Sequence, residues 1–476
     1  MPGPNHRGVT TPPSWQDTSD GAESWETVMR VAVVGAGPTG LFTAMALARR
    51  GHRVTVVDRD TGPRTDGSWP RRGVMQFHHP HALRAQVAEA LQAELPEVWE
   101  ELLAAGAEPV TVAPVDGAAG SETLMAVRCR RSTFERVLRT AAERRPGLNL
   151  HTGHVDEVCT LRGRATGVRV DGTTLDADLV IAATGRAGRL GEDRRAPARG
   201  GDCGIAYVSR QYRLHPGAQP GPMNFPLGQV DVYPGYQSIV FLHDNGIFST
   251  VIARSSDDRA LAALRLSEVF EAAARAIPAL AAWTDPDRAL PFTPVLPGGR
   301  LRNTYQGQVD DTGAVALPGL VFVGDAVCTT NPAVGRGIAT SLLQARQLLH
   351  LLDDDARDLA GLTLAFDAWC SDIIAPWFED HLYWDAELIR RWAGADVDLT
   401  RPLPSDLVVA AAQADPALFP LIGPYLGMRA LPASLDAARP RATEIYASGW
   451  RPPVPQGPSR DELADLAAAH GARSSS

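Results

Sequence analysis

Residues 31–40 read Val-Ala-Val-Val-Gly-Ala-Gly-Pro-Thr-Gly, a short apolar run that ends in three spaced glycines. The apolar run predicts a buried parallel strand, and residues 41–50 predict a helix that ends at Gly51. Residues 54–57 predict the next strand, which is followed by Asp58. A strand, a glycine-rich turn, a helix and a second strand in this order predict a βαβ unit and an α/β (α+β) fold.

The three glycines form the pattern G-x-G-x-x-G, and each has a physical role. The first permits a tight turn, the second lets the backbone approach a pyrophosphate, and the third allows the helix to pack closely on the strand. The helix N-terminus favours an anion, and a carboxylate after the second strand suits ribose hydroxyls. The stretch therefore predicts a site for an adenosine diphosphate group; the alternative is a glycine-rich turn without a ligand. The residues expected at this site are Gly35, Gly37, Pro38, Thr39, Gly40, Asp58 and Arg59.

A second glycine-rich stretch, residues 321–337, reads Val-Phe-Val-Gly-Asp-Ala-Val-Cys-Thr-Thr-Asn-Pro-Ala-Val-Gly-Arg-Gly. It lies between a predicted strand at 320–323 and a predicted helix at 337–352. Asp325 suits a chain of sugar-like hydroxyls, and the helix N-terminus would stabilise the anionic N1–C2=O edge of a reduced flavin. The alternative is a loop with an incidental Gly-Asp pair. Together the two stretches predict one flavin dinucleotide held at both ends, and therefore redox chemistry. The residues expected in the second stretch are Gly324, Asp325, Pro332, Gly335, Arg336, Gly337 and Ile338.

The hydrophobic pattern changes between residues 200 and 300, where apolar and polar residues alternate at 229–233, 238–242 and 247–253. This period of two predicts an antiparallel sheet inserted into the dinucleotide fold. Further helices are predicted over 85–106 (broken near Pro96), 132–143 and, after a capping box at Ser459 to Glu462, near the C-terminus; further strands are predicted over 166–170 and 179–182. We expect a disordered N-terminal tail (1–27), the first part of an FAD-binding domain (28–200), a substrate-binding antiparallel sheet (201–300), the second part of the FAD-binding domain (301–352) and a mostly helical C-terminal region (353–476).

The composition excludes several classes of function. The 476 residues suffice for two or three domains, and the net charge of -9 provides no basic field for nucleic acid. No lysine occurs, which excludes a P-loop lysine, a pyridoxal Schiff base and a lysine general base. The five cysteines are scattered without a Cys-x-x-Cys pair, so we expect neither a disulfide framework nor a metal site. We find no secretory signal and no apolar run near the ~20 residues of a membrane span, and therefore expect a cytoplasmic protein.

The motifs over most of residues 28–350 resemble those of the flavoprotein monooxygenases of the p-hydroxybenzoate hydroxylase fold. In that family one Rossmann motif binds the ADP half of FAD, and a later Gly-Asp segment binds the ribityl and flavin half. Residues 131–135, Arg-Ser-Thr-Phe-Glu, resemble a helix start whose arginine lies near FAD, which implies this role for Arg131. Residues 177–186 end in Ala-Thr-Gly-Arg and resemble a bacterial branch with polyether epoxidases and related tailoring enzymes, which implies cofactor contacts at Thr184 and Gly185.

Residues 72–83, Arg-Gly-Val-Met-Gln-Phe-His-His-Pro-His-Ala-Leu, resemble a loop of the same branch. Met75 stands in place of its proline and Arg84 in place of its last leucine. The resemblance implies a place near the cofactor for Arg72. His79 and His81 titrate near neutrality and are, with Arg72, the candidates for a catalytic role; the alternative is that the histidines pack near the flavin or cap the next helix. Adjacent histidines rarely point at one ion, so this loop does not predict a metal site.

The resemblance implies an FAD-dependent monooxygenase that uses NADPH or NADH and O2 to hydroxylate or epoxidise a small organic substrate. In that family the oxygen is transferred from a flavin C4a-(hydro)peroxide, and the branch implies secondary-metabolite tailoring, for example of antibiotics. Two alternatives remain: a flavin-dependent alkene reductase of the geranylgeranyl-reductase type, and a weakly catalytic flavoprotein that binds a labile metabolite. The Trp-x-Trp-x-Ile-Pro sequence of flavin halogenases does not occur, which disfavours halogenation.

Overall fold

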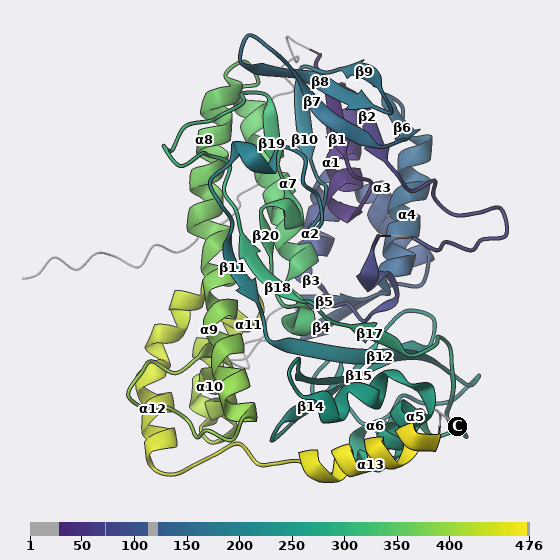
Figure 1. Ribbon diagram of the computed structural model, residues 1–476, viewed down its shortest axis with the longest axis vertical. Coiled ribbons are helices and arrows are strands. Elements are labelled where there is room, and N and C mark those ends of the chain that lie inside the picture. The colour runs from purple at the N-terminus through teal and green to yellow at the C-terminus, as the bar shows by residue number, and fades with distance from the viewer. Residues whose placement is uncertain (1–27, 72, 113–121, 474–476) are drawn as a thin grey trace, which may run out of the picture.

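The computed structural model describes residues 28–71, 73–112 and 122–473 (Figure 1). The expected disorder of residues 1–27 and the expected site residue Arg72 lie outside these ranges. The described chain forms a region around a parallel sheet, a second region around an antiparallel sheet, and a group of helices that runs beside both (Figure 1).

A parallel sheet with the strand order β19-β10-β1-β2-β6 forms the centre of the larger region. Its strands are β1 (Arg30–Val34), β2 (Arg53–Asp58), β6 (Leu148–Thr152), β10 (Leu179–Ala182) and β19 (Leu320–Phe322). The central strands β1 and β10 are apolar and buried, which is typical of parallel strands covered on both faces. The strands predicted around the first glycine turn, at 179–182 and at 320–323 are therefore confirmed.

Helices and a small sheet cover the parallel sheet. The helices are α1 (Pro38–Arg49), α2 (Ala85–Glu94), α3 (Pro96–Ala104), α4 (Arg131–Arg144) and α7 (Gly337–Asp354). α1 packs between α4 and α7, and the antiparallel sheet of β7 (Val155–Leu161), β8 (Arg164–Val170) and β9 (Thr173–Asp176) packs against β10. Pro96 begins a new helix after α2, because proline fits the first turn of a helix but not its interior.

The predicted antiparallel sheet is confirmed, with the main strand order β13-β14-β15-β12-β16. Its strands are β12 (Ile205–Leu214), β13 (Gly228–Tyr233), β14 (Tyr236–Leu242), β15 (Ile247–Ser255) and β16 (Ala289–Pro291). Apolar residues on one face pack against α5 (Ser267–Ala276), α6 (Pro278–Thr284) and α13 (Arg460–Arg473). The opposite face includes Tyr207, Ile239 and Val251, which pack with Leu388.

The helical group begins with α8 (Leu359–Trp369), which continues through a π-helical turn (Cys370–Ile374) into α9 (Ala375–Trp392). The shorter helices α10 (Ser405–Ala410), α11 (Phe419–Leu426) and α12 (Arg439–Ala447) follow. A small sheet of β11 (Arg199–Asp202), β18 (Arg302–Tyr305) and β20 (Cys328–Thr329) connects the two larger sheet regions. α9 packs against β18 and β20, so it lies directly behind the second glycine-rich stretch.

The predicted capping box is confirmed at the start of α13. Ser459 N and Oγ donate to Glu462 Oε2 at 2.8 and 2.9 Å. α13 packs on α5, away from α8 to α12, and places Leu463 and Ala467 in the core of the antiparallel-sheet region. No helix among the described residues is both long and apolar enough to span a membrane.

Candidate functional site

The first glycine turn joins β1 to α1, and two of its glycines are required by close backbone contacts. Gly35 has a φ of +112°, and a Cβ at this position would lie 2.3 Å from the carbonyl oxygen of Ala183. A Cβ on Gly40 would lie 1.9 Å from the carbonyl oxygen of Gly35. A Cβ on Gly37 would meet no atom within 4 Å, so this position faces open space. Gly35 and Gly40 thus provide the tight turn and the close packing that were expected, and the backbone of Gly37 is left open.

The second glycine turn touches the first. Gly324 has a φ of +70°, and a Cβ there would lie 2.9 Å from Oγ1 of Thr39. The backbone N–H of Gly324 donates to Oε1 of Gln344 on α7 at 2.9 Å. The two stretches therefore meet at the carboxyl end of the parallel sheet, where ligands of open α/β folds bind.

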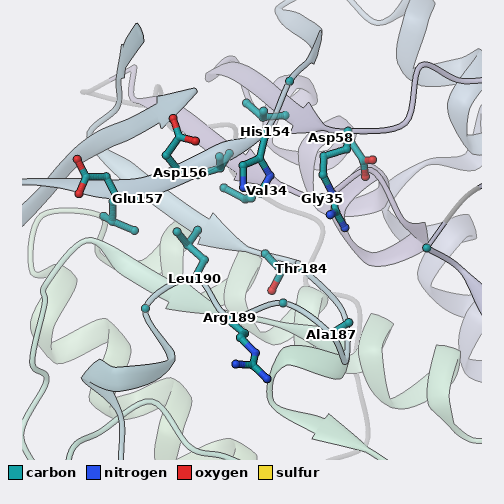
Figure 2. A pocket seen from close by; sticks show the side chains of 18 of the residues that line it. Val34, Gly35, Asp58, His154, Asp156, Glu157, Thr184, Ala187, Arg189 and Leu190 are labelled. Atoms are coloured by element: carbon teal, nitrogen blue, oxygen red, sulfur yellow. The ribbon is translucent and has the colours of Figure 1, made fainter. Parts of the chain in front are cut away.

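Three adjoining cavities of about 670, 160 and 120 Å³ run along the two turns. The largest opens at the end of β2, where Asp58 lies across from residues 153–158 and residues 187–191 (Figure 2). The cavity of about 160 Å³ shares Gly35 and Asp58 with the largest one and Asp325 with the smallest one. One elongated space therefore connects the first turn to the second.

The structure brings most of the predicted site residues to this space. The predicted residues that line it are Gly35, Gly37, Pro38, Thr39, Asp58, Arg59, Arg131, Thr184, Gly185, Asp325, Pro332, Gly335, Gly337 and Ile338. Gly40 and Gly324 line none of the three cavities; their role is the close packing described above. The two stretches that the sequence singled out are thus two walls of one site.

Arg336 does not lie at the cavities, in contrast to the sequence prediction. Its side chain is 2% exposed and points into the helical group, where Nη1 lies 2.8 Å from Oδ2 of Asp380. Its guanidinium also lies 4.5 Å from the ring centroid of Trp377 and 4.8 Å from that of Tyr425. The pairing with a carboxylate and the stacking on aromatic rings draw this side chain away from the site.

Asp325 presents a carboxylate where the two smaller cavities meet. Within the described residues, no hydrogen bond reaches this carboxylate, while the hydroxyl of Thr329 donates to the backbone oxygen of Asp325 at 3.1 Å. Burial raises the pKa of Asp325, and the guanidinium groups of Arg131 and Arg186 act in the opposite direction. A half-buried acceptor without a partner among the described residues is suited to the hydroxyl groups of a ligand.

Asp58 is held in place by the turn that it faces. Its Oδ2 accepts a hydrogen bond from the N–H of Ala36 at 2.6 Å, and its Oδ1 accepts one from Asp60 at 2.8 Å. The guanidinium of Arg71 lies 3.6 Å from the Asp58 carboxylate and 2.9 Å from that of Glu135 on α4. Arg72, which was expected near the cofactor, lies outside the described residues, and the sequence did not identify Arg71 as a structural arginine of this turn.

Arg131, at the start of α4, lines both smaller cavities. Its Nε donates to Oε1 of Glu135 at 2.5 Å, and its Nη1 lies 3.3 Å from Nε2 of His81. Burial and the charge of Arg131 hold the pKa of His81 well below its ordinary value. The imidazole of His81 is therefore neutral where it lines the smallest cavity.

His79 lies behind the site. It is buried, its Nδ1 is 2.7 Å from Oγ of Ser209, and its ring packs edge-on against Tyr207 at 4.9 Å between centroids. Burial lowers the pKa of His79 to about 4, so its imidazole is neutral at physiological pH. His79 lines none of the three cavities, which favours the packing alternative over a catalytic role.

The sequence prediction missed several residues of the site. Gln76 and Arg186 line both smaller cavities, and residues 153–158 form a wall of the largest one. Arg186 ends the Ala-Thr-Gly-Arg turn and Gln76 lies in the 72–83 loop, so both stood in quoted motifs without being assigned. Residues 153–158 carry no motif, and only the fold brings them to Asp58.

The residues of the site fit an FAD molecule. Gly37, Gly185 and Gly337 line the cavities, and a Cβ on any of them would meet no protein atom within 4 Å. Each glycine thus leaves backbone open to a ligand, and the N-termini of α1 and α7 offer unpaired N–H groups for its anionic parts. The described residues contain no cluster of three or more His, Cys, Asp or Glu side chains suited to a metal.

Comparisons with known proteins agree with this arrangement. Residues 30–115 match the family described as FAD dependent oxidoreductase. The chain is 38% identical over 64 residues to the NAD-dependent dihydropyrimidine dehydrogenase subunit PreT of Escherichia coli (strain K12), a match that covers 13% of this chain. The chain thus spans 15% of the length of that curated relative.

Two solved structures share the fold. A triple mutant of the flavin-dependent brominase Bmp2 superposes with a TM-score of 0.59 and 16% identity, over 88% of this chain and 100% of that chain. PqsL, a probable FAD-dependent monooxygenase from Pseudomonas aeruginosa, superposes with a TM-score of 0.56 and 16% identity, over 77% of this chain and 99% of that chain. The predicted fold, that of the p-hydroxybenzoate hydroxylase-type flavin monooxygenases, is confirmed.

Proposed function

We propose that this chain is an FAD-dependent monooxygenase that uses NADPH or NADH and O2 to hydroxylate or epoxidise a small organic substrate. The observation that carries the proposal is the elongated space with Gly35 and Asp58 at one end and Asp325 and Gly337 at the other. A dinucleotide with an adenosine at one end and a flavin ring at the other has matching groups along its length. The FAD dependent oxidoreductase match over residues 30–115 supports the adenosine end.

Under this proposal, each group of residues that lines the site has a defined role. When bound, FAD supplies the redox chemistry that links the nicotinamide, O2 and the substrate. Asp58 accepts hydrogen bonds from the ribose, and the N-terminus of α1 binds the pyrophosphate. Asp325 accepts hydrogen bonds from the hydroxyl chain, and the N-terminus of α7 provides positive potential at the ring. The chain therefore binds and orients the cofactor and excludes water from it.

We propose that the substrate is bound by the face of the antiparallel sheet that carries Tyr207, Ile239 and Val251. These side chains pack with Leu388 of α9, and the support for this proposal is that Tyr207 contacts His79, two residues before His81 at the smallest cavity. His79 contacts this face, since it packs on Tyr207 and its Nδ1 lies 2.7 Å from Oγ of Ser209; because it is neutral, we assign it a packing role and not a role in proton transfer.

We also propose that the enzyme acts in secondary-metabolite tailoring and that it is located in the cytoplasm. The similarity of residues 177–186 to the bacterial tailoring branch supports the first. The five cysteines, none of which forms a disulfide, support a reducing compartment. Although a brominase shares the fold, the missing Trp-x-Trp-x-Ile-Pro sequence favours oxygenation over halogenation.

The first experiment is an absorption spectrum of the purified protein, followed by identification of the cofactor released on denaturation. We expect flavin bands and released FAD. The same sample is then mixed with NADPH and, separately, NADH, first without O2 and then with it. We expect anaerobic reduction of the flavin and rapid reoxidation when O2 is admitted.

The outcomes separate the three candidate functions. A protein that cannot be loaded with FAD would refute the proposal. Anaerobic reduction of an added alkene would favour the reductase of the geranylgeranyl-reductase type. A bound flavin that neither NADPH nor NADH reduces would favour the weakly catalytic flavoprotein.

A further inference from the structure

The second glycine turn is held from behind by side chains that lie far from it in the sequence. Its residues 331–336 form a short loop that includes the 3-10 turn η5 (Pro332–Val334). Pro332 and Gly335 line the smallest cavity, so one side of the loop faces the cofactor site. The other side faces α9.

One end of this loop is held by a buried network of three side chains, those of Asn303, Asn331 and Asp385. The amide of Asn303 donates to Oδ2 of Asp385 at 2.6 Å, and the amide of Asn331 donates to Oδ1 of Asp385 at 2.9 Å. Oδ1 of Asn303 accepts from the backbone N–H of Asn331 at 2.6 Å. All three residues are at most 4% exposed. The network therefore joins β18, the loop and α9 without solvent.

The rest of the loop is held by two arginines. The guanidinium of Arg84 donates to the backbone oxygen of Val334 at 2.6 Å. Arg336 pairs with Asp380 of α9 at 2.8 Å, and the hydroxyl of Tyr425 donates to the same carboxylate oxygen at 2.7 Å. Two carboxylates of α9, at Asp380 and Asp385, thus hold the two ends of the loop.

Burial of the Asp385 network in the protein interior costs free energy. Within the described residues, no cation forms a hydrogen bond or an ion pair with Asp385, and its two acceptor contacts are neutral amides. Burial raises the pKa of Asp385 to about 6, because removal of a carboxylate from water disfavours its charge. A buried polar network of this kind specifies one local geometry more than it adds stability.

We propose that Asp385 is a positioning residue, which fixes the loop 331–336 through Asn331 and thereby sets the affinity of the site for FAD. This inference rests on the proposed function and names a residue that does not itself touch the site. Asp385 accepts from Asn303 and Asn331 together, so the loop keeps the backbone geometry that leaves Gly335 and Gly337 at the cavity wall. Loss of either bond frees the Asn331 end of the loop.

The test uses D385N, D385A and a matched control on the same helix, E387Q. Asn at position 385 retains one acceptor oxygen, and Ala retains none. Glu387 is 5% exposed and pairs with Arg390 and Arg401 at 2.9 and 3.0 Å, away from the loop. The E387Q variant therefore removes a similarly buried carboxylate of α9 without touching Asn331.

Two readouts are measured on the full chain. The first is hydrogen exchange of the peptide that contains residues 331–336 in the apoprotein, and the second is the dissociation constant of FAD from a fluorescence titration. We expect exchange in this peptide to rise in D385N and more in D385A, with FAD binding weakened about 10-fold and more than 10-fold. We expect E387Q to match the wild type in both, and the melting temperature of each apoprotein to report any global loss.

The outcomes separate this inference from the proposed function. If the wild type binds FAD and the Asp385 variants bind it equally well, the inference is overturned while the proposed function stands. The same holds if E387Q changes both readouts as much as D385N does, since the effect would then be structural. If the wild type binds no FAD, the proposed function falls and the inference falls with it.

Discussion

The two glycine-rich turns of the site differ in what holds them. The first turn is held by its own backbone and by β10 next to it, since Gly40 packs on Gly35 and Gly35 packs on Ala183. The second turn is held by side chains from distant segments, among them Arg84 and Asp385. The first turn is therefore held mainly by close backbone contacts, whereas the second is held mainly by side chains. Four predictions test this difference, and they are given in order of decreasing expected change in free energy.

The largest effect is expected from Gly40→Val, which breaks the first turn at its tightest contact. A Cβ at this position would lie 1.9 Å from the carbonyl oxygen of Gly35, and this oxygen belongs to backbone that cannot move freely. We expect a loss of about 5 kcal/mol in the free energy of unfolding, measured by urea denaturation of the apoprotein. The control is Gly423→Val in α11, where a Cβ meets no atom within 4 Å and the helix propensity changes by less than about 1 kcal/mol. Equal losses in the two variants would contradict the packing role of Gly40.

The next effect concerns the ion pair that holds the far end of the second turn. Among the described residues, Arg336→Met would leave the buried carboxylate of Asp380 with only the Tyr425 hydroxyl as a donor. We expect a loss of about 3–5 kcal/mol in the free energy of unfolding. Arg144→Met removes a solvent-exposed pair with Glu101 and should change it by less than about 1 kcal/mol. A small effect at Arg336 would show that the second turn does not depend on this distant support.

A third prediction separates binding from stability at the first turn. Gly37→Val places a side chain in the open space of the site, so it should weaken FAD binding about 100-fold, or about 2.7 kcal/mol. The free energy of unfolding of the apoprotein should change by less than about 1 kcal/mol, because the new Cβ meets no protein atom. Asp325→Ala should also lower FAD retention, through loss of an acceptor. If the Gly37→Val protein retained its full yellow colour, FAD binding would not depend on the first turn, and this turn would not belong to the proposed site.

The smallest effect concerns pH and the Asp385 network. Burial raises the folded-state pKa of Asp385 to about 6, above the value of about 4 in an unfolded chain. Protonation is thus easier in the folded state, so the stability from this group is present below pH ~4 and is lost as the pH rises through ~6. Asp380, Asp406 and Cys203 lie near the same network and are present in both the wild type and the variant.

The measurement is the melting temperature of apo D385N minus that of the apo wild type, at pH 4.5 and at pH 7.5. Because Asn does not titrate, we expect this difference to be more positive at pH 7.5. Parallel melting curves across this range would show that Asp385 has an ordinary pKa and that burial does not penalise its charge. The result would sharpen the contrast with the first turn, whose glycine contacts do not titrate.

The contrast also explains which features could be predicted from the sequence. The strand, turn and helix at 31–50 were predicted because the glycine spacing and the apolar period are local signals. The position of the second turn was predicted for the same reason, and Asp325 lies at the site as expected. The direction of the Arg336 side chain was not, since a Gly-Arg-Gly sequence does not reveal that Trp377 and Asp380 pack behind it. The role of Asp385 also depends on contacts that only the folded chain creates.

α13 has a consequence for the order of events on the ribosome. The strands β12 to β15 are translated well before α13, but the core on their outer face includes Leu463 and Ala467 from that helix. At ~5–20 residues per second, α5 remains without α13 for on the order of ten seconds. During this interval the surface of α5 that α13 covers in the folded protein is open to chaperones and to neighbouring nascent chains. The step most vulnerable to aggregation is therefore expected to be synthesis of this sheet region, well away from the cofactor site.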